Sequence, residues 1–403
     1  MTREEVYIEC LTKLEKSDFL LLELATGMGK SKQAIDIINY LVETKYQGKH
    51  TSMLLLVAKT VHKQTWKDEF KKWGGINVDE LTIECYESLK KHEYESFDFV
   101  VMDECHHLHS DKRLDLFSTL TYGNVIGLSA TIPKKLKQYF QYEYAAEVVT
   151  CSIVDAIEDE VLPELQIILY PLQLDNVRPT ESIEINPKAK GKTYYGNYNE
   201  LWKYRKMKVH AIISCTPRQR ANEYNSQILY EKNRYMRTRQ DFLKNKWLFD
   251  CGERIKYLAN LKNNIVLSIL QRLEKERTIT FCKTIEQADI LGKYSIHSKN
   301  KDSDIIYNDF NAKKINHIVS VNVLNEGANL VDCKYAVFAN YSSSEICSAQ
   351  RVGRSLRHKS PIIILPYYEA TREEEIVNTM IESFKEESIH TIHSLKELDK
   401  FIQ

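Results

Sequence analysis

The chain has 403 residues, and its 56 lysine and arginine side chains are balanced by 56 aspartate and glutamate side chains. A formal net charge of zero excludes an overall field that would draw the protein to nucleic acid. The length predicts two or three domains of about 150 residues each, ample to bury hydrophobic cores.

The nine cysteines include no C-x-x-C pair, so reduced thiols in a cytosolic compartment are the expected state. Residues 1–10 lack a signal-peptide pattern, and no apolar run approaches the about 18 residues of a membrane span. We therefore expect a soluble, cytoplasmic protein with no membrane partner. The abundance of tyrosine, isoleucine, lysine and asparagine suggests an AT-rich genome and a virus-encoded chain.

Residues 20–33, LLLELATGMGKSKQ, carry the most direct functional signal. The apolar residues 19–22 predict a buried parallel strand, and the residues from 30 onward have the apolar spacing of an amphipathic helix. The residues between strand and helix would surround a phosphate chain: Thr26, Gly27, Met28, Gly29, Lys30 and Ser31. Glycines let backbone N–H groups close around phosphate oxygens, Lys30 would reach the β and γ phosphates, and Ser31 would hold Mg²⁺. The general pattern has a glycine where this chain has Leu24, and the alternative is a glycine-rich turn without function.

Strands and helices alternate from residue 1 to about residue 150. The expected strands span residues 19–22, 53–58, 81–85, 97–102 and 124–128. Such strands, with polar residues at their carboxyl ends, predict an α/β fold with a doubly wound parallel sheet and a site at that edge. Residues 1–150 are assigned to this first domain.

Acidic residues end the apolar strand in VVMDECHHL, residues 100–108. Asp103 would hold Mg²⁺ through water, and Glu104 would orient and deprotonate the attacking water as the general base. His106 is predicted to be a coupling residue near the γ-phosphate. The alternatives are a structural Asp-Glu helix cap and, for the three closely spaced histidines, a zinc site.

The tripeptide Ser129-Ala130-Thr131 follows the apolar strand VIGL. After the two preceding motifs, the hydroxyl groups of Ser129 and Thr131 are predicted to couple the nucleotide site to movement of the second domain. The alternative is an ordinary turn at the end of a strand.

Residues 151–262 break the alternation of strands and helices. From Lys203 to Lys262 there are 15 lysine or arginine side chains against 5 acidic ones. Helical residues dominate, so we expect a linker and a basic, largely helical insertion rather than a third full domain. Arg237 and Arg239, with aromatic side chains nearby, could extend a nucleic-acid track, and a solvated helix face is an equal alternative.

The alternation resumes between residues 263 and 366, which are assigned to a second domain. The expected strands span residues 279–282, 317–321, 335–339 and 361–365, and they predict a second sheet of the same type. Residues 367–403 are acidic but have apolar residues at helical spacing. A packed helical extension is therefore favoured over a disordered tail.

QRVGRSLRH, residues 350–358, is the strongest signal in the second half of the chain. On a helix, Gln350, Arg354 and Arg357 would lie at positions i, i+4 and i+7 of one face. A guanidinium group delivered from the second domain would stabilise the charge that phosphoryl transfer builds on the γ-phosphate. Gly327, in the preceding loop, is assigned to nucleotide binding. The alternative is a solvated basic helix.

The motifs ATGMGKS, DECH, SAT, ITFCKTIEQAD, LNEGANL and QRVGRSLR resemble, in this order, those of superfamily 2 helicases and translocases. The DECH-bearing group, similar to type III restriction helicase subunits and phage branch-migration helicases, is nearest. The resemblance implies two RecA-like domains with ATP and Mg²⁺ between them, nucleic acid across both, and Arg354 and Arg357 as arginine fingers. It also places nucleic-acid contacts at strand ends, at Lys59, Thr60, Ser88, Lys283 and Thr284.

These residues predict an ATP hydrolase that works as an ATP-dependent DNA helicase or duplex DNA translocase. Duplex, branched or single-stranded DNA is the expected partner. RNA is the first alternative, because contacts with a phosphodiester backbone do not fix the identity of the sugar. A motor subunit of a restriction or nuclease complex would need a protein partner. A non-hydrolysing nucleic-acid-binding module is the alternative from a different class.

Overall fold

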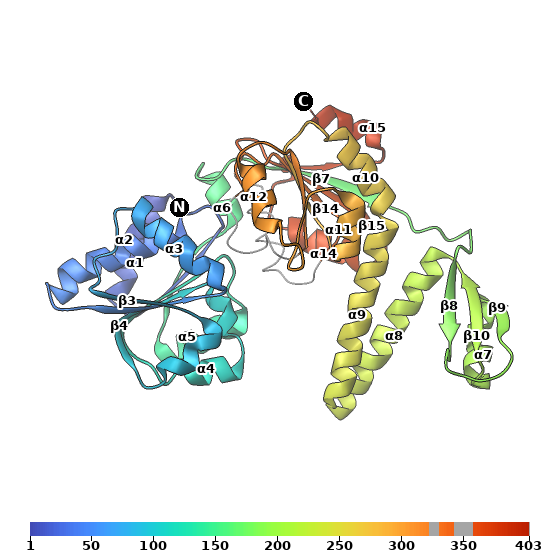
Figure 1. Ribbon diagram of the computed structural model, residues 1–403, viewed down its shortest axis with the longest axis horizontal. Helices are drawn as coiled ribbons and strands as arrows, with labels where there is room; N and C mark the ends of the chain where they lie inside the picture. Colours follow the sequence, from blue (N-terminus) through green and yellow to red (C-terminus); the bar gives the residue numbers. More distant parts are fainter. Residues whose placement is uncertain (322–329, 342–357, 403) are drawn as a thin grey trace.

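The computed structural model describes residues 1–321, 330–341 and 358–402, and it has two α/β lobes joined by a linker (Figure 1). A smaller sheet and a long helical hairpin extend from the second lobe. Both lobes were predicted from the sequence, whereas two strands of the second sheet and the smaller sheet were not.

The first lobe is built on a six-stranded sheet with the order β3-β2-β4-β5-β1-β6, in which every pair is parallel. Its strands are β1 (Phe19–Leu24), β2 (Ser52–Val57), β3 (Glu80–Cys85), β4 (Ser96–Asp103), β5 (Thr121–Ser129) and β6 (Glu147–Cys151). Its helices are α1 (Arg3–Leu14), α2 (Lys30–Leu41), α3 (Thr60–Lys72), α4 (Asp111–Phe117) and α5 (Lys134–Tyr144).

The apolar run of β1 explains why this sheet is covered on both faces. Leu20 and Leu22 pack into one core, which includes residues of α1, α2 and α3, whereas Phe19 and Leu21 pack into another core that includes residues of α5. Successive side chains of a strand point to opposite faces, so a strand that is apolar throughout needs helices on both sides. The doubly wound sheet predicted from the sequence is confirmed.

The second lobe contains a seven-stranded parallel sheet with the order β12-β13-β11-β14-β15-β7-β16. Its strands are β7 (Gln166–Leu172), β11 (Thr278–Phe281), β12 (Ser295–Ile296), β13 (His317–Ser320), β14 (Tyr335–Phe338), β15 (Ile362–Tyr368) and β16 (Ile389–Thr391). Its helices are α10 (Asn263–Arg272), α11 (Ile285–Leu291), α12 (Ser303–Asn311), α14 (Arg372–Ile381) and α15 (Leu395–Leu398).

Two of these strands come from segments that the sequence analysis placed outside the second sheet. β7 lies in the stretch assigned to the linker and insertion, and β16 lies in the stretch expected to be helical. Parallel strands pair across long crossovers, so their partners cannot be read from neighbouring residues. β7 therefore ties the segment that leaves the first lobe directly into the second sheet.

The middle of the chain also contains a small sheet that the sequence did not predict. It has the order β8-β10-β9, with β8 (Glu181–Ile185), β9 (Tyr194–Asn197) and β10 (Ala211–Cys215), and α7 (Leu201–Met207) follows β9. Its core includes Ile183, Ile185, Ala211 and Ile213, which alternate along β8 and β10. Each strand is short, so this alternation was masked by the polar and basic residues around it.

The predicted basic helical segment is present as a hairpin of α8 (Pro217–Thr238) and α9 (Asp241–Leu261). Figure 1 shows this hairpin projecting from the second lobe, with the small sheet beside the start of α8. Within the described ranges, no helix is both long and apolar enough to cross a membrane.

Candidate functional site

The carboxyl ends of three neighbouring strands in the first lobe carry the motifs found in the sequence. β4, β5 and β1 are adjacent, with Asp103 paired to Leu128 and Glu23 paired to Ser129. In parallel α/β sheets, ligands bind at this edge. The phosphate loop, the acidic pair and the Ser129 turn therefore lie at one edge of the sheet.

The loop between β1 and α2 has the backbone conformation that its glycines allow. Gly27 has φ +103° and Gly29 has φ +83°, values that L side chains rarely adopt. Gly29 is also the N-cap of α2, and a glycine has no side chain with which to cap the helix. The start of a helix presents backbone N–H groups and a partial positive charge, which suit an anion.

The other residues of the loop are held from several directions. Thr26 and Met28 are buried, and Ser31 is half-buried at the start of α2. The Nζ of Lys30 donates to the carbonyl of Leu24 at 3.0 Å, so its amine lies back along the loop. An Nη2 of Arg3 donates to the carbonyl of Gly27 at 3.1 Å.

The acidic pair stands at the end of β4 in contrasting environments. Trp66 of α3 donates from Nε1 to a carboxylate oxygen of Asp103 at 2.9 Å. Burial, reinforced by the adjacent Glu104 carboxylate, raises the pKa of Asp103 to about 6, although the Trp66 hydrogen bond and the charge of Lys30 oppose this rise. Glu104 has φ +52°, which turns the chain sharply as it leaves the strand.

Glu104, His106 and Ser129 form a buried cluster. The Ser129 hydroxyl donates to the carbonyl of Thr131 at 2.8 Å, so it accepts a hydrogen bond from Nδ1 of His106, 3.0 Å away. An Oε2 of Glu104 lies 3.4 Å from both the Ser129 hydroxyl and His106 Nδ1. The residues predicted to couple the nucleotide site to motion thus touch the predicted general base.

Two residues that hold this edge were not found from the sequence. Trp66 lies on α3, and its ring N–H positions Asp103. Glu23, near the end of β1, accepts from the backbone N–H of Ile132 at 2.8 Å and pairs with Lys137. The only available signal for Glu23 was a charged residue inside an otherwise apolar strand.

The predicted nucleic-acid contacts of the first lobe lie together in one hollow of about 580 Å³. Lys59, Thr60 and Ser88 all line it, at the carboxyl ends of β2 and β3. Lys63 and Lys91 line it as well and were missed in the sequence. Lys63 is paired with Glu84 at 2.9 Å, whereas Lys91 is exposed.

The predicted contacts of the second lobe are placed less uniformly. Lys283 and Thr284 follow β11, at the carboxyl edge of the second sheet, but the Thr284 hydroxyl already accepts from the backbone N–H of Gln287 as a helix cap. Arg237 and Arg239 lie far along the chain's hairpin, at the end of α8. Four predicted residues lie outside the described part of the chain: Gly327, Gln350, Arg354 and Arg357.

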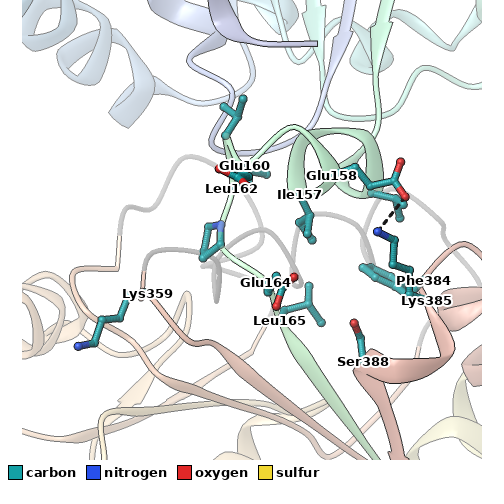
Figure 2. A pocket seen from close by; sticks show the side chains of 13 residues that line it. Ile157, Glu158, Glu160, Leu162, Glu164, Leu165, Lys359, Phe384, Lys385 and Ser388 are labelled. Carbon is teal, nitrogen blue, oxygen red and sulfur yellow. Dashed lines mark ion pairs between the residues drawn. The ribbon is translucent and has the colours of Figure 1, made fainter.

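The linker between the lobes lies beside the phosphate loop, and it also lines a hollow of about 560 Å³. A Cβ built on Gly27 would lie 2.8 Å from Cδ2 of Leu162, and Leu162 also lines the hollow. Figure 2 shows the hollow between linker residues and the C-terminal segment, with Lys385 paired to Glu158 of α6 (Ile153–Glu158) at 3.2 Å.

Comparison with known proteins shows what the chain is similar to. A family model described as "Type III restriction enzyme, res subunit" matches residues 3–134, and one described as "Helicase conserved C-terminal domain" matches residues 261–359. An African swine fever virus protein, "Putative ATP-dependent RNA helicase", is 29% identical over 131 residues, which cover 27% of this chain and 24% of the viral protein. The chain thus spans about a quarter of the length of that relative.

Solved structures agree on the fold. An ATP-dependent Type ISP restriction-modification enzyme, LlaBIII, bound to DNA has a TM-score of 0.56 at 14% identity, covering 100% of this chain and 32% of that one. Dbp5 of S. cerevisiae, bound to RNA and ADP BeF3, has a TM-score of 0.57 at 10% identity, covering 99% and 92%. The two lobes therefore share the RecA-like α/β fold of these structures.

The order of the motifs, the two family matches and the fold agree with one another. The chain is similar to superfamily 2 helicases and translocases, and residues 3–134 are similar to the type III restriction helicase subunit.

Proposed function

We propose that the chain hydrolyses ATP with Mg²⁺ and uses the energy to move along DNA, as a helicase or duplex translocase. The observation that carries this proposal is the meeting of the phosphate loop, the acidic pair and the His106–Ser129 pair at one sheet edge. Each group is common alone. Together, at the carboxyl ends of neighbouring strands, they supply the parts that phosphoryl transfer to water requires.

The residues present fit a magnesium nucleotide. The positive φ of Gly27 and Gly29 and the helix start after them suit phosphate oxygens. Ser31 and Asp103 offer the hard oxygen ligands that Mg²⁺ prefers, and Asp103 is close enough to Lys30 for the amine to lower its pKa. When bound, the cation would neutralise charge on the phosphate oxygens.

The remaining residues take distinct roles in this proposal. Glu104 accepts a proton from the attacking water and holds the water in line. His106 and Ser129 link its position to the Thr131 turn, because both lie 3.4 Å from the Glu104 carboxylate and the Ser129 hydroxyl donates to the carbonyl of Thr131. Gln350, Arg354 and Arg357 keep the roles inferred from the sequence, as groups from the second domain that stabilise the transferred phosphoryl charge.

Nucleic acid is proposed to lie along the carboxyl edges of both lobes. Lys59, Thr60 and Ser88 share a hollow in the first lobe, and Lys283 and Thr284 follow β11 in the second. Contacts of this kind read the phosphodiester backbone rather than the bases. The type III restriction relationship favours DNA as the substrate and a motor role beside a partner protein. The name of the viral relative favours RNA instead, and it also supports a virus-encoded origin.

Steady-state ATPase assays test the proposal. Lys30→Ala should abolish turnover, because the loop loses its only charged group that reaches the phosphates. Glu104→Gln should retain nucleotide binding and lower kcat by about 100-fold or more. Lys32→Ala, one residue further along the same helix and paired with Asp36, is the matched control and should behave as wild type. Normal turnover in either site variant would reject the proposal.

The substrate is resolved by measuring stimulation of the ATPase by four polymers. Single-stranded DNA, duplex DNA, forked DNA and RNA of equal length are compared at equal nucleotide concentration. Stronger stimulation by either DNA duplex than by RNA is the expected result. Stimulation by RNA alone would replace the DNA assignment with the RNA-remodelling alternative.

A further inference from the structure

The α8–α9 hairpin ends in a surface that the core of the second lobe does not explain. We define the hairpin tip as residues 229–249. Near their bases the helices pack on β8 and α10, and along their length they pack on each other. Figure 1 shows the tip pointing away from the seven-stranded sheet of the second lobe and from the small β8-β10-β9 sheet.

The base of the hairpin is fixed rigidly to the second lobe. Lys262, directly after α9, is fully buried and donates to a carboxylate oxygen of Glu373 at 2.6 Å and to the carbonyl of Pro366 at 3.3 Å. Its ammonium also lies 4.6 Å from the ring centre of Tyr341. Arg218, at the start of α8, donates to the carbonyl of Glu369 at 3.1 Å. The orientation of the hairpin is therefore set by the lobe itself.

The two helices are also locked to each other near the tip. Glu231 is buried on α8 and pairs with both Arg234 and Lys246, the latter on α9. The rings of Tyr235 and Trp247 stack across the hairpin with centroids 6.1 Å apart. The one buried acid of the tip is thus neutralised within the hairpin, and the side chains outside these contacts are presented on a stiff support.

What the tip presents is a mixture of cations and flat apolar groups. Among the described residues Arg237 forms no ion pair, and it is exposed beside Arg239. The exposed large apolar side chains are Leu229 (59% exposed), Tyr230 (62%), Met236 (48%), Phe242 (61%), Leu248 (52%) and Phe249 (64%). Isolated exposed apolar residues are common, but six of them within the adjoining ends of two helices mark an interaction surface.

The cations and the rings are arranged in pairs. The guanidinium of Arg234 lies 5.5 Å from the ring centre of Tyr230, and that of Arg239 lies 5.6 Å from the ring centre of Tyr235. Within each pair the ring and the cation are four residues apart, so they are neighbours on the helix surface, and the two pairs lie on different sides of α8 because five residues separate Tyr230 from Tyr235. Each ring thus stands beside a positive group, which is the arrangement that binds a base together with its phosphate.

We propose that the hairpin tip is a second binding site for unpaired nucleic acid, separate from the strand-end contacts. Arg237 and Arg239 would contact phosphates, and Tyr230, Phe242 and Phe249 would stack on bases. A polynucleotide is the polymer that combines dense negative charge with flat apolar faces, and it complements this surface in both respects. The inference rests on the proposed motor function, since it extends the path of the strand from the lobes onto the hairpin.

Binding of fluorescein-labelled single-stranded DNA, measured by anisotropy over a series of salt concentrations, tests the inference. Arg237→Glu/Arg239→Glu should weaken binding by about 10-fold or more at low salt and reduce the slope of log K against log salt by about 1.4. Phe242→Ala/Phe249→Ala should weaken binding by about 5-fold or more while leaving that slope unchanged. The two doubles therefore separate charge from stacking.

The control is a matched charge reversal on the far side of the second lobe from the hairpin tip. Lys396→Glu/Lys400→Glu changes the net charge equally, at and just after α15, and should bind as wild type. A far-ultraviolet circular dichroism spectrum like that of wild type confirms that each exposed double variant folds. Because the control carries the same change in net charge, it excludes a purely global electrostatic effect.

The possible results lead to separate conclusions. Wild-type affinity and slope in Arg237→Glu/Arg239→Glu, or wild-type affinity in Phe242→Ala/Phe249→Ala, would overturn the inference while leaving the motor function intact. Competition by polyglutamate as strong as that by unlabelled DNA of equal charge would also overturn it, because the tip would then be a site for acidic proteins. Failure of the wild-type chain to bind any nucleic acid would reject the proposed function itself.

Discussion

Substitution of Gly27 by alanine tests how the linker supports the phosphate loop. At φ +103°, an alanine costs about 1–3 kcal/mol in backbone strain alone. Its Cβ would also lie 2.8 Å from Cδ2 of Leu162, well inside the contact distance of two carbon atoms. Leu162 is buried in the core, so its side chain can move only by leaving its preferred rotamer, at about 0.5–1.5 kcal/mol.

Gly29 provides the comparison, because it also has a positive φ but a Cβ at this position would not meet Leu162. Its φ is +83°, but no described atom lies within 4 Å of a Cβ built on it. Gly29→Ala should therefore cost only the strain, about 1–2 kcal/mol. Gly27→Ala should be less stable than Gly29→Ala by about 1 kcal/mol.

The assay is thermal and urea unfolding of the purified chain, together with ATP affinity by calorimetry. A double-mutant cycle with Leu162→Val removes the crowded methyl group, so Gly27→Ala should cost about 1 kcal/mol less in that background. Equal costs for the two glycine variants, with no coupling to Leu162, would refute the contact between linker and loop.

Two further predictions follow from buried groups of the second lobe. Lys262→Met should destabilise that lobe by about 3–5 kcal/mol, because Glu373 is left buried without its partner, and Lys262→Met/Glu373→Leu should recover at least half of the loss in urea unfolding. Burial lowers the pKa of His317 to about 4, and its Nε2 lies 2.9 Å from the Thr280 hydroxyl. As the pH falls, His317 is protonated in the unfolded chain before it is protonated in the folded one. The folded state therefore loses stability as the pH falls from about 6.5 towards 4. The ring is enclosed although the residue keeps some exposure. We therefore expect the free energy of unfolding to fall by about 1–2 kcal/mol between about pH 7 and pH 5, and we expect His317→Gln to abolish this fall. An identical pH dependence in wild type and His317→Gln would contradict this assignment.

Local patterns were enough to predict the elements that carry the site. β1, β4 and β5 are apolar runs with polar residues directly after them, and the glycines of the phosphate loop permit few other conformations. Because parallel strands align their carboxyl ends, the sequence also predicted that these motifs would meet. This inference needed neither the register nor the order of the strands.

Contacts between distant elements could not be predicted in the same way. Trp66 reaches Asp103 from a helix 37 positions earlier in the chain, and Glu23 reaches Ile132 across 109 positions. Nothing near either residue in the sequence indicates its partner. The membership of β7 in the second sheet has the same origin, since it pairs with β15 nearly two hundred residues later.

A net charge of zero excludes an overall attraction to nucleic acid, but it does not exclude a local surface that binds it. Fields between exposed charges are screened beyond about 8–10 Å at physiological salt, so a bound strand responds to nearby side chains and hardly to the total. In the hairpin tip, the buried Glu231 is neutralised by Arg234 and Lys246, and the remaining cations, Lys232, Arg237, Arg239 and Lys244, outnumber the one other acid, Asp241. The acidic residues that bring the net charge to zero include those of the C-terminal segment, whose α15 lies on the far side of the second lobe from the hairpin tip (Figure 1). A neutral chain can therefore present a surface that binds a polyanion, and the position of the cations decides whether it does.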